Sequence, residues 1–368
     1  MSKHFFLGQA AHFSRSERLK HTFSIGRKND FRKLRTFLAD KYGSNVSHVA
    51  ITKNGRTALA IALKANLEKG AKVVINGFTC YAVIEAVEAA GMTPVFADIE
   101  EKTLHYNAKI LEKVLAANEN VQGIIVQNTL GIPVDIAAIE EVAKEHDLKI
   151  FEDMAHCTGI KYADGREAGT VGVAAALSFG KEKSIDAIVG GAVILRDLSL
   201  PSVKNPRKKP TFADTFRARF YPLFGAIYRG LARIKLEKFW MGFLIKTHQV
   251  ERSANSKLDF ERRPAYFVAK TALRQLKKLP ENRQPIRRFA LVKSRDELLA
   301  KLKTAGYYFD GFWFETPIAP ARFYKKANFD EDRCKTAVEV AAEIINLPTH
   351  YDDKALEPAL KIIEEYKK

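Results

Sequence analysis

The middle of the chain constrains the fold most, because two short apolar runs there each end on polar residues. The run Leu148–Phe151 is followed by Asp153, and the run Ala174–Phe179 contains Ser178 and is followed by Lys183. Short apolar runs closed by glycine or charge are typical of buried strands in an α/β sheet. Open α/β sheets bind ligands at the carboxyl ends of their strands. We therefore expect these three polar side chains to meet at one edge of a sheet.

Similar apolar runs recur through the first 200 residues and alternate with segments of helical period. The predicted strands are residues 49–52, 72–75, 94–97, 123–127, 149–152, 174–178 and 192–195. The helices predicted between them are residues 57–66, 81–90, 108–117 and 136–146. This alternation predicts an α/β fold, with a mostly parallel seven-stranded sheet and helices on both faces.

A carboxylate, a hydroxyl and a lysine at one sheet edge are the groups that pyridoxal 5'-phosphate (PLP) requires. The lysine binds the cofactor covalently, the carboxylate keeps the pyridine nitrogen protonated, and the hydroxyl binds a phosphate oxygen. Taken singly, Lys183 could equally be a solvated lysine and Asp153 a helix cap.

Four strings together resemble the DegT/DnrJ/StrS family of PLP-dependent sugar aminotransferases in content, order and spacing. They are FEDMAHCTG, LSFGKEKS with GGAVIL after it, TKNGRTALAIAL, and GFTCYAVIEAVEAAGMTPVFADIE. The resemblance covers residues 25–198 and resumes weakly from residue 260, where IINLPTH is similar to the family's closing segment. It implies a fold-type-I PLP-transferase with a small C-terminal α+β domain.

The chain is accordingly predicted to have three parts. Residues 1–198 form the large PLP-binding domain with an N-terminal segment, and residues 199–259 form a basic, aromatic helical insertion. Residues 260–368 supply a long helix and the small C-terminal domain.

The resemblance assigns the phosphate-binding turn to Gly55, Arg56 and Thr57, where a helix N-terminus favours an anion. Thr57 as a simple helix cap is the alternative. The family usually places an aromatic side chain against the pyridine ring. Cys80 stands at the commonest aromatic position, so the stacking prediction falls on the next residue, Tyr81.

By the same resemblance, Asp153 pairs with the pyridine nitrogen and Ser178 binds the phosphate. His156 lies near the phenolic oxygen of the cofactor, or else is a structural histidine that bonds a loop carbonyl. Two lysines compete for covalent attachment. The family's spacing from Ser178 selects Lys183 as the catalytic residue, whereas Lys181 fits a shorter spacing found in other PLP enzymes.

Arg263 matches the arginine of a family signature and is predicted to bind the cofactor. Glu261 stands where the signature has an asparagine that reaches the phosphate from the neighbouring subunit. We expect Arg262 or Arg263 to supply that contact. The resemblance also implies a homodimer.

The net charge of +17 is concentrated between Leu200 and Val250, where eleven Lys or Arg residues face two acids, a surplus of +9. Seven apolar residues there share one side of a predicted helix: Phe216, Phe220, Leu223, Phe224, Ile227, Leu231 and Ile234. The aromatic run Lys238–Lys246 follows. Basic flanks around such residues suit peripheral contact with an anionic membrane. The alternative is a helical flap whose apolar stripe packs on the main domain or on a partner subunit.

The remaining composition excludes several classes of protein. The three scattered cysteines argue against a disulfide framework or a zinc site, and we expect no metal. The basic segment lacks any recognisable nucleic-acid module. Without a signal peptide or an apolar run long enough to span a bilayer, we expect a cytoplasmic protein, peripheral at the inner membrane surface if the basic segment binds lipid.

These observations favour a PLP-dependent aminotransferase. The resemblance implies transfer of an amino group from glutamate to a keto sugar nucleotide, in surface glycan or polysaccharide biosynthesis. The lysine argues against the family's sugar dehydratases, in which it is replaced. The alternative class is a non-catalytic PLP-fold binding protein recruited to a membrane through its basic segment.

Overall fold

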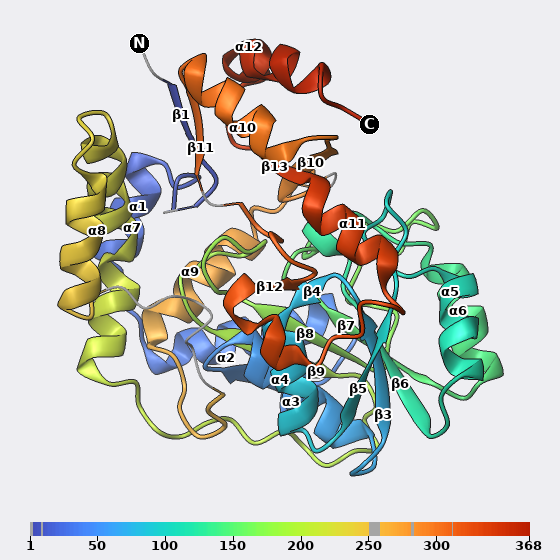
Figure 1. Ribbon diagram of the computed structural model, residues 1–368. Coiled ribbons are helices and arrows are strands. Elements are labelled where there is room, and N and C mark those ends of the chain that lie inside the picture. The colour runs from blue at the N-terminus through green and yellow to red at the C-terminus, as the bar shows by residue number, and fades with distance from the viewer. Residues whose placement is uncertain (1–2, 9, 250–257, 281–282, 311) are drawn as a thin grey trace.

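The computed structural model describes residues 3–8, 10–249, 258–280, 283–310 and 312–368, built around a seven-stranded sheet (Figure 1). The strand order is β2–β9–β8–β7–β6–β3–β5. β9 runs antiparallel to both neighbours, and the other pairs are parallel. The strands are Val49–Thr52 (β2), Lys72–Asn76 (β3), Thr93–Ala97 (β5), Val121–Val126 (β6), Lys149–Asp153 (β7), Ala174–Ser178 (β8) and Gly191–Leu195 (β9). The predicted mostly parallel sheet is confirmed.

Helices cover both faces of the sheet, because side chains of each strand alternate between two apolar clusters. Ala50 and Ile75 point to the face covered by α3 (Gly55–Asn66) and α4 (Tyr81–Ala89). Ile51 points to the opposite cluster. The helices on that side are α2 (Lys28–Lys41), α5 (Ala108–Ala116), α6 (Ile136–Glu145) and α9 (Tyr266–Leu276).

The C-terminal part adds short sheets and helices to one end of this core. β10 (Arg287–Leu291) pairs antiparallel with β13 (Ile344–Pro348). The surrounding helices are α10 (Arg295–Thr304), α11 (Lys335–Glu343) and α12 (Asp353–Glu364). β12 (Ile318–Ala319) pairs with β4 (Thr79–Cys80) of the large core.

The N-terminal strand joins these C-terminal elements. β1 (Lys3–Phe6) pairs in parallel with β11 (Tyr307–Asp310), and Phe5 packs in the same apolar cluster as Leu298 and Leu356. The first residues thus lie with the C-terminal part, although the sequence predicts them with the large domain. The three-part division of the chain stays a prediction.

The predicted insertion folds into two helices, α7 (Phe212–Ala232) and α8 (Glu237–Lys246), that lie at one side of the molecule beside α1 (Arg15–Thr22) (Figure 1). Residues 250–257 of the insertion lie outside the described residues. The sequence predicts that Pro222 starts or kinks the first helix. The helix instead begins ten residues earlier, because Thr211 and Asp214 form a capping box there.

Pro222 sits inside α7 and has a structural consequence, because it has no N–H to donate to the carbonyl of Ala218. That carbonyl accepts a hydrogen bond from His21 Nε2 of α1 at 2.8 Å instead. The proline therefore leaves the Ala218 carbonyl available for a hydrogen bond from α1. Within the described residues, neither α7 nor any other helix is long and apolar enough to cross a membrane.

Candidate active site

The carboxyl ends of β7 and β8 bring Asp153 and Ser178 to the same sheet edge, because the two strands pair in parallel. A cavity of about 650 Å³ lies at this edge. Seven of the nine predicted cofactor-binding residues line it: Gly55, Arg56, Asp153, His156, Ser178, Lys183 and Arg263. Their presence in one cavity agrees with the proposed chemistry, although their roles stay predictions.

Lys183 and His156 form the central contact, with Nζ 2.9 Å from Nε2. The other ring nitrogen, Nδ1, accepts the backbone N–H of Leu130 at 3.2 Å and so carries no proton. Burial, the largest cause, and the charge of Arg287 hold the pKa of His156 well below its usual value, which favours the neutral ring. A neutral ring that accepts at Nδ1 carries its proton on Nε2 and directs it at the lysine nitrogen. This arrangement favours the uncharged amine of Lys183, which is the nucleophilic form.

Burial acts in the same direction on the lysine. It lowers the pKa of Lys183 below the ordinary value, although Cys80 and Asp153 oppose the shift by charge attraction. It also raises the pKa of the Asp153 carboxyl, which the backbone N–H of Ala155 and the charge of Lys183 partly offset. A cation placed beside Asp153 would therefore be bound strongly, because its positive charge would stabilise the ionised carboxylate that burial disfavours.

Gly55 brings the start of α3 against Ser178. Asn54 caps the helix, with its Oδ1 accepting the N–H of Thr57 at 2.9 Å. A Cβ atom on Gly55 would lie 2.6 Å from the Cβ of Ser178, closer than side chains approach. A glycine is thus needed for the helix N-terminus and the serine hydroxyl to face one small space, and that pairing favours an anion such as phosphate.

Thr57 and Arg56 both contact other residues of the protein. The Thr57 hydroxyl donates to Asn54 Oδ1 at 2.9 Å and accepts the N–H of Asp259 at 3.2 Å. Thr57 is fully buried and does not line the cavity, so the geometry favours a structural role at the helix start. Arg56 does line the cavity and forms an ion pair with Glu85 of α4.

Tyr81, which the sequence predicts to stack on the pyridine ring, does not line the main cavity. Its ring stacks on Phe323, with centroids 4.7 Å apart, and borders a separate cavity with Glu85 and Lys326. Cys80 lines the main cavity in its place. α4 begins at Tyr81, and this first helical residue packs its ring on Phe323. The geometry does not support ring stacking by Tyr81.

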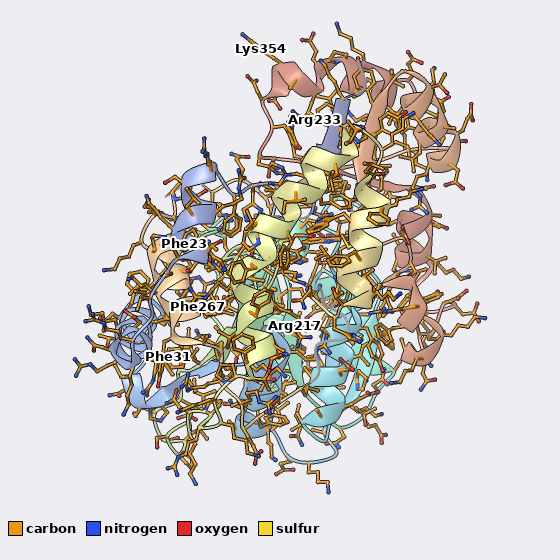
Figure 2. The ribbon with its side chains drawn as sticks, turned by 90° about the vertical axis from the view of Figure 1, so that its left-hand side faces the viewer. Phe23, Phe31, Arg217, Arg233, Phe267 and Lys354 are labelled. Carbon is orange, nitrogen blue, oxygen red and sulfur yellow. The ribbon has the colours of Figure 1, made fainter. Side chains whose placement is uncertain are left out.

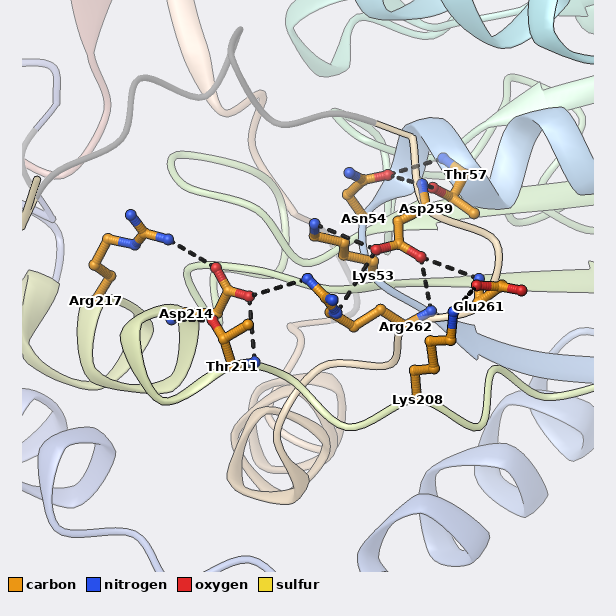
Figure 3. A network of polar contacts seen from close by, with 10 residues as sticks. All are labelled: Lys53, Asn54, Thr57, Lys208, Thr211, Asp214, Arg217, Asp259, Glu261 and Arg262. Atoms are coloured by element: carbon orange, nitrogen blue, oxygen red, sulfur yellow. Dashed lines mark hydrogen bonds and ion pairs between the residues drawn. The ribbon is translucent and has the colours of Figure 1, made fainter.

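The segment around Arg263 borders the cavity through a network of ion pairs (Figure 3). Asp259 lies 3.7 Å from Lys53, and Arg262 lies 3.8 Å from both Asp259 and Asp214. This network ties the start of α7 to the turn that precedes α3.

Glu261 and Arg263 occupy different parts of that segment. Glu261, at the position of the signature asparagine, pairs with Lys208 and does not line the cavity. Arg263 lines the cavity, and its guanidinium lies 3.9 Å from the ring centroid of Tyr266. Of these two residues, Arg263 is the one placed to reach a phosphate.

Sequence reasoning missed Trp313, which belongs to the C-terminal part. Its ring stacks on His156 at 4.9 Å between centroids, and Lys183 Nζ lies 4.8 Å from the ring. Arg287 packs on the same ring at 3.6 Å and pairs with Glu182 at 2.9 Å. The only sequence signal was the aromatic-rich string YYFDGFWFETPIAP.

The loop that carries Lys183 is fixed by Asp186. Its carboxylate accepts the N–H groups of Glu182 at 2.7 Å and of Ile188 at 2.9 Å. The competing lysine, Lys181, lies 4.1 Å from the ring centroid of Tyr221 in α7. The loop thus sets Lys183, rather than Lys181, against His156.

A family model described as the DegT/DnrJ/EryC1/StrS aminotransferase family matches residues 16–203, just over half of the chain. The chain belongs to this family. The resemblance that the sequence suggested is confirmed.

The GDP-perosamine synthase of Escherichia coli O157:H7 is a relative, 29% identical over 186 residues, which are 50% of this chain and 50% of that protein. The chain thus matches its curated relatives over about half of their length. A DegT DnrJ EryC1 StrS aminotransferase from Brucella abortus has a similar structure, with a TM-score of 0.67, 18% identity and 95% of each chain covered.

An E. coli GDP-4-keto-6-deoxy-D-mannose-3-dehydratase with bound hydrated PLP is also similar, with a TM-score of 0.67 and 14% identity. That match covers 97% of this chain and 98% of the other. At such identities the likeness shows the fold, and it confirms the predicted fold-type-I class.

PLP is the cofactor of this family, and the residues present fit it. Gly55 leaves room for a phosphate beside Ser178. Among the described residues, Asp153 uses only Oδ1 as a hydrogen-bond acceptor, so Oδ2 is available to a ring N–H. Lys183 offers an amine with a lowered pKa in the same cavity.

Proposed function

We propose that this protein is a PLP-dependent aminotransferase that moves an amino group from glutamate to a keto sugar carried on a nucleotide. The proposed role is in surface glycan or polysaccharide biosynthesis. One observation carries the proposal: Lys183 Nζ lies 2.9 Å from His156 Nε2 in the cavity that also contains the Asp153 carboxyl group, and burial lowers the pKa of the lysine. A protein that only binds ligands has no need of a buried lysine with a lowered pKa.

Each residue then has a distinct task. Asp153 keeps the ring nitrogen of the cofactor protonated, and the Gly55 turn with Ser178 binds its phosphate. When bound, PLP supplies a sink for the electron pair left at the substrate carbon as its proton departs. Lys183 Nζ takes that proton and returns it, while the Nε2–H of His156 orients the lysine lone pair.

The charge of the cavity wall favours an anionic substrate. Eight Lys or Arg residues and four Asp or Glu residues line it. These basic residues are Lys53, Arg56, Lys181, Lys183, Arg217, Arg262, Arg263 and Arg322. A cavity of about 650 Å³ falls in the range of small-molecule sites, and the surplus positive charge suits the diphosphate of a sugar nucleotide.

The test separates the donor half from the acceptor half of the reaction. PLP-loaded protein is mixed with ¹⁵N-labelled glutamate, and release of 2-oxoglutarate is measured without a sugar. Keto sugar nucleotides are then added, and mass spectrometry follows the label into an amino sugar. Release of 2-oxoglutarate followed by a labelled amino sugar supports the proposal.

Two results would argue against it. Binding of PLP without any 2-oxoglutarate release would favour the non-catalytic alternative. Release of the keto acid without a labelled sugar, across the sugar nucleotides tried, would keep the transaminase and reject the substrate class. The implied homodimer stays a prediction that analytical ultracentrifugation can measure, with the 41.3 kDa chain as the unit.

A further inference from the structure

The α7–α8 hairpin packs on the body mainly through small residues and Tyr221, and it turns its Phe side chains away. The buried positions of α7 are Ala218, Tyr221, Pro222, Gly225 and Ala232, spaced as one helical face. At 100° per residue, this face lies opposite the predicted apolar stripe. The stripe therefore does not pack on the main body of the protein. The flap alternative had included such packing.

Specific contacts hold the buried face of α7 in place. His21 bonds the Ala218 carbonyl, and Arg219 Nη1 donates to the carbonyls of Thr22 at 2.8 Å and Ser24 at 3.0 Å. The Arg219 guanidinium also lies 4.4 Å from the ring centroid of Phe267. The orientation of the hairpin is thus fixed by polar contacts, together with Tyr221, which packs in one cluster with Phe13 and Ile188.

The aromatic side of α7 is covered only in part, by α8. The Phe216 and Phe220 rings lie tilted to each other at 4.5 Å, and Phe224 meets Trp240 edge-on at 6.1 Å between ring centroids. Trp240 Nε1 donates to the Phe224 carbonyl at 3.2 Å. The two helices form one outward-facing unit at the side of the molecule (Figure 2).

Large apolar side chains remain exposed around the turn between the two helices. Phe239 is 80% exposed, Ile234 is 63% exposed and Leu236 is 51% exposed. The rest of the hairpin adds Phe212, Leu223, Ile227, Phe243 and Ile245. Monomeric soluble proteins rarely expose a contiguous apolar surface of this kind without a partner.

Cations alternate with these apolar residues at the same turn. Arg233, Lys235 and Lys238 are exposed there, and Figure 2 shows Arg233 at the end of α7. Within the described residues these three side chains form no ion pair. From residue 215 to residue 249 the sequence has seven Lys or Arg and one acid, Glu237.

We propose that the turn and the outer face of the hairpin form a docking surface for an anionic lipid bilayer. Exposed Phe and Leu side chains enter the headgroup region, while the flanking Lys and Arg side chains contact lipid phosphates. A second copy of this chain fits the surface less well. A two-fold symmetric contact centred on the turn would bring Arg233, Lys235 and Lys238 close to the same three cations of the other copy.

Docking there would place the active site next to the membrane. α7 contributes Asp214, Thr215, Arg217, Ala218 and Tyr221 to the cavity wall, and the exposed stripe residues Leu223 and Ile227 do not line it. The proposal does not rest on the PLP chemistry, since it concerns only the outer face of the hairpin.

Vesicle co-sedimentation of the full chain tests the proposal, at low and at physiological salt. The vesicles are phosphatidylcholine alone and phosphatidylcholine mixed with phosphatidylglycerol. We expect binding to the mixed vesicles only, weakened by salt.

Two triple variants separate the contributions of apolar and charged residues. The first carries Ile234→Ser, Leu236→Ser and Phe239→Ser, and the second carries Arg233→Gln, Lys235→Gln and Lys238→Gln. Each should weaken binding to the mixed vesicles by about tenfold or more. All six positions are exposed, so the fold should survive, and circular dichroism checks this.

A matched control removes the same charge elsewhere. The control variant carries Lys109→Gln, Lys113→Gln and Lys144→Gln. These three lysines are exposed on α5 and α6, which lie on the far side of the molecule from the hairpin (Figure 1). The control should bind the mixed vesicles like the unmodified chain.

Three outcomes would overturn the proposal. The first is no binding to mixed vesicles even at low salt. The second is an equal loss of binding in the control and in the charge variant, or full binding by the serine variant. Either result would mean that general electrostatic attraction explains the vesicle binding. The third is a dimer that the serine variant converts to a monomer without any vesicle binding, which would assign the surface to a second copy.

Discussion

The central sheet and the α7–α8 hairpin bury their residues in opposite ways. Every residue of β2 and β9 is buried, held between helices on both faces. The hairpin buries mainly small residues on one side and leaves Phe212 at 85% and Phe239 at 80% exposed. The difference indicates that the sheet fixes the chemistry of the site while the hairpin presents a surface. Substitutions in the two regions should therefore affect different measurements.

The largest effect should come from Lys183→Ala at the sheet edge. Loss of the amine removes both the covalent attachment and the proton transfer, so the rate of amino transfer should fall by about 10⁴-fold. Phe239→Ser in the hairpin should leave that rate unchanged. Steady-state kinetics measure both variants. An equal loss of activity in the two would contradict the distinction between the sheet edge and the hairpin.

Asp153→Asn should lower the rate by about 10³-fold while PLP stays bound. The amide has no charge with which to stabilise a protonated ring nitrogen, although it fills the same space. Single-turnover measurement of 2-oxoglutarate release gives the rate, and equilibrium dialysis gives the bound PLP. An unchanged rate would mean that another group protonates the ring.

The sequence predicted the sheet well because apolar runs between turn residues specify buried strands on their own. Asp153 and Ser178 followed from this, since a strand end fixes where the next polar side chain lies. Trp313 could not be found in this way, because it reaches Lys183 from 130 residues further along the chain, through tertiary packing alone. Tyr81 packs on Phe323 and not in the main cavity, because the direction of a side chain at a helix start depends on tertiary packing.

The sequence left the orientation of α7 open, with its apolar stripe either facing a membrane or packed on protein, for a different reason. Large apolar residues at helical spacing usually mark the buried face, but here Ala218, Gly225 and Ala232 allow the closest approach to the body. A hydrophobicity pattern gives such small residues little weight. The hydrogen bond between His21 and the Ala218 carbonyl, made available by Pro222, is also invisible to periodicity.

Burial of His21 beside that carbonyl gives the contact between α1 and the hairpin a pH dependence. Burial lowers the pKa of His21 from 6.5 to about 4, so the folded protein holds the neutral ring while the unfolded chain is protonated below pH 6.5. The resulting stability is complete above pH 6.5 and is lost as the pH falls toward 4. The free energy of unfolding should drop by about 3 kcal/mol over this range from His21.

Urea unfolding at several pH values measures this drop in the unmodified chain and in two variants. In His21→Gln the drop should be smaller. The control His146→Gln removes an exposed histidine that pairs with Glu112, and should keep the full drop. Equal profiles in all three proteins would show that His21 does not carry the effect.

Two glycines give the smallest and most direct contrast. Gly55→Ala places a Cβ against Ser178 and should weaken PLP binding by about tenfold, measured by fluorescence titration. Gly230→Ala in α7 meets nothing within 4 Å and should leave PLP affinity unchanged. It should stabilise the helix by about 0.5–1 kcal/mol. A loss of PLP affinity in the α7 variant would contradict the division of roles.

The central claim, that Lys183 holds the cofactor, is tested most directly by reduction of the PLP-loaded protein with borohydride. Digestion and tandem mass spectrometry then locate the pyridoxyl group. The account predicts the modification on Lys183, with Lys181→Ala still modified at that position and Lys183→Ala unmodified at either lysine. A pyridoxyl group on Lys181 in the unmodified chain, or on neither lysine, would contradict it.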